Sequence, residues 1–85
     1  MRYRVIILRP AQKELEAIAS PSFEKVEEKL LSLRDNPRPP GCKKMKDREG
    51  AWRIRSGDYR IIYDINDSAT TVTVVRVGHR KEIYR

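Results

Sequence analysis

Three arginines lie close together in the middle of the chain. Arg53 and Arg55 are two positions apart, and Arg60 follows them after a Ser-Gly-Asp turn. Residues two positions apart in a strand point to the same side, and a hairpin over this turn brings Arg60 within about 5–8 Å of the other two. Guanidinium groups this close repel one another unless they share an anion, which indicates a site for phosphate oxygens. The alternative is a row of solvated charges that protects the edge of a sheet.

A group of fixed cations suits the cleavage of RNA as well as its binding. When a 2′-hydroxyl attacks the neighbouring phosphorus, the transition state is more negative than the ground state, so cations aimed at its oxygens lower the barrier. Arginine stays protonated at neutral pH and is a poor proton carrier. The candidates for a general base and acid are therefore His79, which is the only histidine, Tyr84 and a desolvated lysine such as Lys46.

Three lysines precede the arginines in the sequence. Lys43, Lys44 and Lys46 are expected to contact phosphates and to hold a nucleic acid without reading its bases. A lysine run that is simply solvated is the alternative.

The last eight residues, GHRKEIYR, hold a second group of candidates. We expect a strand to end near Val77 and Gly78 to let the chain turn. The turn would bring His79, Arg80 and Tyr84 toward the three arginines. Tyr84 would then offer a stacking platform for an unpaired base. The alternatives are a Tyr84 that packs on the core and a His79 that faces solvent.

The net charge of +7 gathers in two segments. Residues 43–60 carry seven cations and three anions, residues 76–85 carry four cations and one anion, and the remaining residues sum to zero. If the two segments meet in space, they form one strongly positive surface whose natural ligand is a polyanion.

The rest of the composition narrows the class of protein. One cysteine and one histidine exclude an internal disulfide and an unaided zinc site, and the acidic residues form no cluster, so we predict no metal and no cofactor. The apolar run at residues 5–8 is too short for a signal peptide or a membrane span. We therefore expect a cytoplasmic protein with no membrane partner.

The first half of the chain predicts one strand and two helices. Alternating apolar residues indicate a strand over residues 2–8. Apolar residues at spacings of three and four then indicate helices over residues 10–19 and 21–35. Asn36-Pro37 ends the second helix, and a proline-rich loop follows.

The second half of the chain has the two-residue period of strands. Trp52 and Ile54 alternate with two arginines, and apolar residues at every second position of 59–65 indicate the hairpin partner of that strand. Residues 70–77 are mostly β-branched and form a last strand. The order β-α-α-β-β-β predicts an α+β fold, with two helices packed on a mainly antiparallel four-stranded sheet, and residues 1–85 form a single domain.

Two stretches resemble the RelE family of bacterial and archaeal toxins, within the RelE/ParE superfamily. They are WRIRSGDYRIIY and VGHRKEIYR, and the resemblance extends over nearly the whole chain. It implies a small fold like that of microbial ribonucleases, and a toxin of a type II toxin–antitoxin system that cleaves mRNA in the ribosomal A site, without metal, by attack of the 2′-hydroxyl. It also implies contacts with rRNA, a RelB-like antitoxin that holds the toxin inactive, and operator DNA bound only through the complex with that antitoxin.

The resemblance also assigns roles to individual residues. Arg53 and Arg55 match positions at which related toxins often carry two lysines that act in proton transfer and phosphate binding. Arg60 matches an arginine that clamps the phosphate, and Arg80 matches a second arginine near the scissile phosphate. Tyr84 matches a tyrosine that stacks on the substrate base.

Arginine at positions 53 and 55 keeps the phosphate clamp but weakens any role of these residues in proton transfer. We therefore hypothesise that His79 carries the proton. Lys44 and Lys46 match basic positions that help to hold RNA or the ribosome.

Two other functions are compatible with the same sequence. A ParE-like inhibitor of DNA gyrase would share the fold and act by binding, and a basic RNA-binding module would bind without catalysis. The arginine pair, Arg60 and the His-Arg…Tyr tail favour the nuclease, because poisoning gyrase needs no phosphate clamp with a stacking tyrosine.

Overall fold

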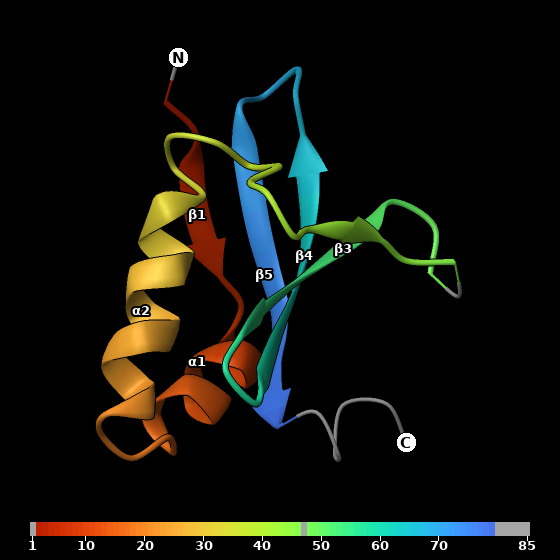
Figure 1. The fold of residues 1–85 in the computed structure, drawn as a ribbon. Helices are drawn as coiled ribbons and strands as arrows, with labels where there is room; N and C mark the ends of the chain where they lie inside the picture. Colours follow the sequence, from red (N-terminus) through yellow and green to blue (C-terminus); the bar gives the residue numbers. More distant parts are fainter. Residues whose placement is uncertain (1, 47, 80–85) are drawn as a thin grey trace.

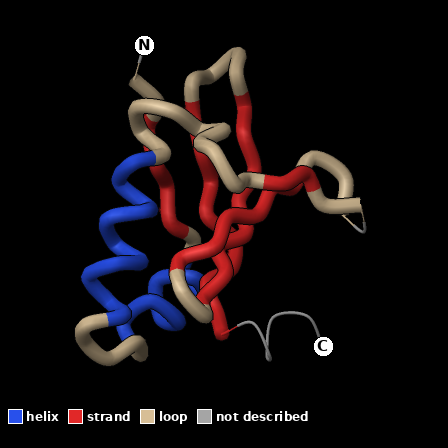
Figure 2. Tube along the Cα trace, viewed as in Figure 1, coloured by secondary structure: helices blue, strands red, loops and turns tan. Residues whose placement is uncertain are grey.

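The computed structural model describes residues 2–46 and 48–79. Two helices pack on one face of a five-stranded sheet (Figures 1 and 2). The helices are α1 (Arg9–Glu16) and α2 (Ser22–Ser32), and the strands are β1 (Arg4–Ile7), β2 (Lys43–Lys44), β3 (Ala51–Ser56), β4 (Tyr59–Asn66) and β5 (Thr71–His79). The predicted α+β class and the placement of both helices in the first half of the chain are confirmed.

The sheet has the strand order β1-β5-β4-β3-β2. β1 runs parallel to β5, and the other neighbours are antiparallel. The prediction of four strands was wrong by one strand, because β2 was assigned to a loop. β2 is only two lysines long and has no apolar alternation, so it exists as a strand through its pairing with β3 rather than through a pattern of its own.

Both helices are shorter than the sequence pattern predicts. α1 ends at Glu16 and α2 at Ser32, where the predicted ranges continued to residues 19 and 35. Tighter backbone bonds follow each helix, from Ile18 N to Leu15 O at 3.1 Å and from Leu33 N to Leu30 O at 3.2 Å. Such bonds close the last turn of a helix. The apolar stripe continues past each end because these residues still pack on the sheet.

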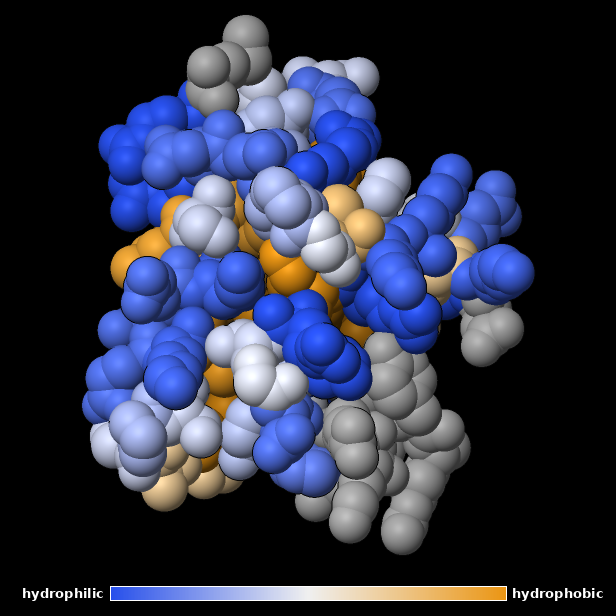
Figure 3. All heavy atoms as spheres, in the orientation of Figure 1, coloured by the Kyte–Doolittle hydropathy of each residue, from blue (hydrophilic) through white to orange (hydrophobic). Residues whose placement is uncertain are grey.

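The main core lies between the helices and the sheet. Its fully or nearly buried members are Ala11, Leu15, Ile18, Val26, Leu30 and Leu33 from the helical half and Ile54, Ile61, Tyr63, Val72, Val74 and Val77 from the strands. Figure 3 shows that hydrophilic residues cover most of one side of the molecule, with hydrophobic atoms in hollows between them. Among the described residues, no helix is long and apolar enough to cross a membrane.

A bulge changes which face of the sheet each β5 residue occupies. Val74 and Val77 are three positions apart, yet both belong to the main core. The register between β4 and β5 shifts between Ile62 and Tyr63, so β5 has one extra residue at this point. Val75 therefore faces away from the helices, and it packs with Ile62 in a small second cluster on the other side of the sheet.

The edge of β5 beyond β1 is closed by α1. β1 pairs with β5 only as far as Val74, whereas β5 continues to His79. The Glu14 carboxylate accepts a hydrogen bond from the Val77 backbone N–H at 3.0 Å, and it accepts three more from the Arg76 guanidinium at 2.9–3.2 Å. The carboxylate thus replaces the missing strand neighbour and anchors the last residues of β5.

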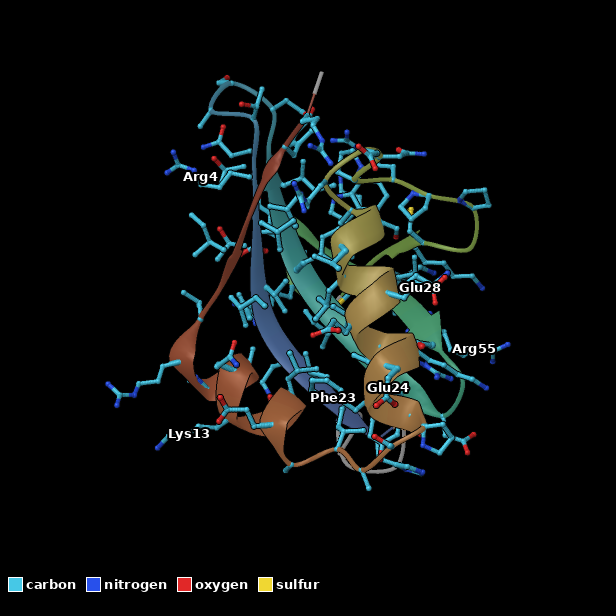
Figure 4. The ribbon with its side chains drawn as sticks, turned by 90° about the vertical axis from the view of Figure 1, so that its left-hand side faces the viewer. Arg4, Lys13, Phe23, Glu24, Glu28 and Arg55 are labelled. Atoms are coloured by element: carbon cyan, nitrogen blue, oxygen red, sulfur yellow. The ribbon has the colours of Figure 1, made fainter. Side chains whose placement is uncertain are left out.

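Loss of the Glu14 carboxylate is expected to destabilise the protein. Glu14→Ala leaves the Val77 N–H without its acceptor, so the free energy of unfolding should fall by about 1–2 kcal/mol in urea denaturation. Glu28→Ala is the matched control, because Glu28 is exposed on α2 (Figure 4) and should change stability by no more than about 0.5 kcal/mol. Equal losses in the two variants would contradict this role for Glu14.

Candidate phosphate-binding pocket

The hairpin of β3 and β4 places the predicted arginines in one pocket. Arg55 lies directly opposite Arg60 in the antiparallel ladder, and Lys43 of β2 lies directly opposite Arg53. Directly opposite residues have their Cβ atoms about 4.5–5.5 Å apart. The pocket has a volume of about 470 Å³ and is lined by Pro40, Gly41, Lys43, Arg53, Ile54, Arg55 and Arg60.

The strand period explains why these cations share one side of the sheet. Ile54 and Ile61 point into the main core under the helices. Their neighbours Arg53, Arg55 and Arg60 therefore point to the opposite side. In Figure 4, Arg55 projects from the hairpin on the side of the molecule opposite Arg4 and Lys13. The site is thus separate from the cations carried by β1 and α1.

The pocket is positively charged. One lysine and three arginines line it, and none of its described lining residues is an aspartate or a glutamate. The Arg60 side chain folds back toward the turn between β3 and β4. There its Nη1 donates to the carbonyl oxygens of Tyr59 at 3.3 Å and Gly57 at 3.5 Å. Bonds of this length are weak. An anion that entered the pocket would therefore offer Arg60 a stronger partner than it has here.

The other predicted lysines lie outside this group. Lys44 pairs with Trp52, whose side chain packs on the helix-side core, so Lys44 and Lys43 point to opposite sides of the sheet. Lys46 is exposed and does not line the pocket. Arg80 and Tyr84, which were predicted to complete the site, lie outside the described residues.

His79 lies at the end of β5 and contacts Tyr59. The two residues are opposite each other in the ladder, and their rings meet edge to face at 81°, with centroids 5.7 Å apart. Tyr59 packs on the helix-side core, so the imidazole is on the side of the sheet opposite the Arg60 side chain. His79 is not among the described residues that line the pocket. Its proton-carrying role stays a prediction.

The predicted turn at Gly78 was wrong. The strand continues through this residue, with Gly78 opposite Arg60 and His79 opposite Tyr59. The eight-residue β4 offers a partner for each of these positions, and the contact between the two rings favours the extended conformation.

One wall of the pocket was not predicted from the sequence. Pro40 and Gly41 come from the loop that precedes β2, and Gly41 takes the left-handed φ of +95° that favours glycine. The Pro-Pro-Gly run at residues 39–41, one residue before the two lysines of β2, was the available signal, because it restricts how the chain enters β2.

Known proteins resemble this chain over most or all of its length. The sequence model described as the ParE toxin of type II toxin–antitoxin systems, parDE, matches residues 5–84. The chain belongs to the RelE/ParE superfamily of toxins. Toxin RelG of Mycobacterium tuberculosis is 33% identical to this toxin over 86 residues, an alignment that covers 100% of the chain and 99% of RelG. The mRNA interferase toxin RelE of Escherichia coli K12 is 31% identical over an alignment of 84 positions, and the alignment covers 87% of the chain and 81% of that protein.

Solved structures of similar toxins share the fold. The RelBE2 toxin–antitoxin complex of Mycobacterium tuberculosis contains a chain that superposes with a TM-score of 0.81 at 31% identity, covering 94% of this toxin and 100% of that chain. The archaeal RelE–RelB complex of Pyrococcus horikoshii gives a TM-score of 0.82 at 25% identity, covering 96% and 99%. The two helices and the mixed sheet are therefore those of RelE structures.

The pocket makes a quantitative prediction about RNA binding. Arg53→Ala and Arg60→Ala should each weaken the affinity for a labelled single-stranded RNA, because each removes a contact with phosphate. Each should also reduce the slope of log K against log salt by about 0.7, as measured by fluorescence anisotropy over a range of KCl concentrations. Lys13→Ala is the control on the other side of the molecule (Figure 4). A loss of affinity in Lys13→Ala as large as in the arginine variants would show that only net charge matters.

Proposed function

We propose that this toxin is an endoribonuclease of the mRNA-interferase type, which cuts mRNA on the ribosome without a metal ion. The observation that supports the proposal most strongly is the convergence of Lys43, Arg53, Arg55 and Arg60 in one pocket with no carboxylate among its described lining. Such a pocket attracts a phosphodiester. It also has the charge needed to promote cleavage.

The proposed chemistry follows from the charge that the phosphate gains. Attack of the 2′-hydroxyl on the adjacent phosphorus forms a bond to the 2′-oxygen and breaks the bond to the 5′-oxygen of the next nucleotide. The five-coordinate state between these events is more negative than the starting diester, so Arg55 and Arg60 would bind it more strongly than they bind the substrate. A proton must leave the 2′-hydroxyl and another must reach the 5′-oxygen, and arginine is poorly suited to both transfers.

Inhibition of DNA gyrase is the alternative function, because the matching family model carries the name ParE. The matching family model bears the ParE name, whereas the curated relatives are RelE and RelG toxins. An inhibitor that acts by binding has no need for four cations directed at one small pocket. The pocket therefore favours the nuclease over the gyrase inhibitor and, with the relative named as an mRNA interferase, over a non-catalytic RNA-binding module.

An antitoxin of the RelB type is the partner that this function implies. A groove of about 690 Å³ lies beside β1, and its apolar wall includes Val5, Ile7, Phe23 and Leu30. Leu31 of α2 also lines the groove and is 51% exposed. We propose that an apolar segment of the antitoxin covers this groove. The solved complexes of similar toxins with RelB proteins support a partner of this kind.

Expression in a bacterium tests the proposed activity. Induction of the toxin should arrest growth and create new mRNA ends within codons, without induction of the DNA-damage response. The double variant Arg55→Ala, Arg60→Ala should lose the new ends, because the pocket loses the cations that lie directly opposite each other. Co-expression with the product of the adjacent reading frame, expected to be a short acidic antitoxin, should restore growth. DNA damage with intact transcripts would instead identify a gyrase inhibitor.

The role of His79 is tested separately from the role of the pocket. If the imidazole carries a proton in cleavage, His79→Ala and His79→Gln should each lower the single-turnover rate on programmed ribosomes by about 100-fold or more. Tyr59→Phe keeps the ring that His79 contacts, so it controls for packing at this end of the sheet. Unchanged cleavage in both His79 variants would remove His79 from the mechanism and leave the phosphate clamp intact.

A further inference from the structure

The loop between α2 and β2 is fastened to three other parts of the fold. Arg38 in this loop donates two hydrogen bonds to the Asp67 carboxylate, from Nη1 at 3.2 Å and from Nη2 at 2.9 Å. The Tyr3 hydroxyl donates to the same carboxylate at 2.6 Å. The Arg38 guanidinium also lies over the Trp52 ring, 5.2 Å from its centroid. Arg38 thus joins the loop to the β4–β5 turn, to the residue before β1 and to β3.

Two further bonds define the path of the same loop. The buried Tyr63 hydroxyl donates to the Pro37 carbonyl oxygen at 2.8 Å. Burial raises the pKa of the Tyr63 phenol, so it remains a donor at neutral pH. The Cys42 N–H donates to the Pro39 carbonyl oxygen at 3.1 Å. Figure 1 shows the loop crossing from the end of α2 over the sheet to β2.

The fastened loop forms the wall of the cationic pocket. It contributes Pro40 and Gly41 and leads directly into Lys43, whereas Arg38 is not among the lining residues. β2 pairs with β3 over a short stretch, with Lys43 opposite Arg53 and Lys44 opposite Trp52. The contacts of Arg38 with Asp67 and Trp52 hold the chain in addition, from a position just before the wall.

We propose that Arg38, Asp67 and Trp52 are positioning residues that hold residues 39–43 against the pocket and so raise its affinity for single-stranded RNA without touching the RNA. The inference rests on the proposed function, because that function assigns the RNA phosphates to this pocket. It adds to the site three residues from different parts of the fold: the loop between α2 and β2, strand β3, and the turn between β4 and β5.

The substitution Asp67→Asn tests the proposal well, because long-range electrostatics and the positioning role predict opposite changes in RNA affinity. The hydrogen bonds from Arg38 and then from Tyr3 hold the pKa of Asp67 below its usual range, so its carboxylate is charged at neutral pH. Asp67→Asn removes that negative charge, and long-range electrostatics alone would then tighten the binding of RNA. Loss of the forked ion pair releases the wall, so positioning predicts weaker binding.

The affinity of the full chain for an RNA that cannot be cleaved distinguishes these results. The probe is a labelled single-stranded oligonucleotide with 2′-O-methyl groups, and binding is followed by anisotropy. Asp67→Asn should bind it about three- to tenfold more weakly than the parent toxin. Asp35→Asn removes the same charge from the exposed Arg2–Asp35 pair, so it should bind as well as the parent or more tightly.

A second variant and a second kinetic measurement separate positioning from general destabilisation. Arg38→Lys keeps the charge but loses the forked hydrogen bonds to Asp67, so it should also weaken binding. For both variants the single-turnover cleavage rate at saturating programmed ribosomes should match the parent, and only the concentration of programmed ribosomes that gives half of this rate should rise. Equal affinities for Asp67→Asn and Asp35→Asn would overturn the proposal.

The thiol of Cys42 reports on the loop without any RNA. Cys42 is the only cysteine in the chain and is half-buried in the fastened loop. It should react with a thiol reagent severalfold faster in Asp67→Asn than in Asp35→Asn, and equal rates would overturn the positioning role. A failure of the proposed function would give a different result. In that case Arg55→Ala and Arg60→Ala would bind RNA as tightly as the parent does.

Discussion

The backbone ladder of β4 with its two neighbours is the constraint on which the rest of the structure depends. β4 pairs with β3 on one side and with β5 on the other, and it contributes alternately to the two faces of the sheet. Ile61 and Tyr63 are buried under the helices, while Arg60 faces the pocket on the other side. A slip of one residue would bury the guanidinium and expose the tyrosine. The hydrophobic core therefore fixes the position of the cations, although none of them belongs to it.

This constraint explains how four cations are brought together in one pocket. Backbone hydrogen bonds and the buried core hold the two facing pairs, Arg55 with Arg60 and Lys43 with Arg53. If a phosphate binds there, as proposed, these cations are already in place around it and need no rearrangement during the reaction. The more negative transition state would then attract them more strongly than the substrate does, which is the preference on which the proposed catalysis depends.

The sequence predicts those parts of this fold that follow from local periodicity. The alternation around Trp52 and Ile54 was sufficient to predict the hairpin and the common side of its arginines, and the helical spacing was sufficient to predict both helices. Features set by contacts between distant segments were not predictable in this way. The Glu14 carboxylate, which closes the edge of β5, accepts a hydrogen bond from the Val77 amide, 63 residues away in the sequence. Nothing in the sequence around Glu14 indicates that contact. The prediction of a turn at Gly78 was wrong for the same reason, because β4 provides the backbone partners that extend β5.

The candidate site shows the same division between local and distant information. Arg53, Arg55, Arg60 and Lys43 meet because they lie on neighbouring strands of one meander. The placement of His79 on the other face depends on the bulge between Ile62 and Tyr63, because the extra residue determines which side of β5 each later side chain occupies. Without that bulge, the imidazole at position 79 would share a face with the arginines. The fold alone therefore does not determine the function of a superfamily member. The register of a single strand pair decides which side chains share a side of the sheet with the cationic pocket.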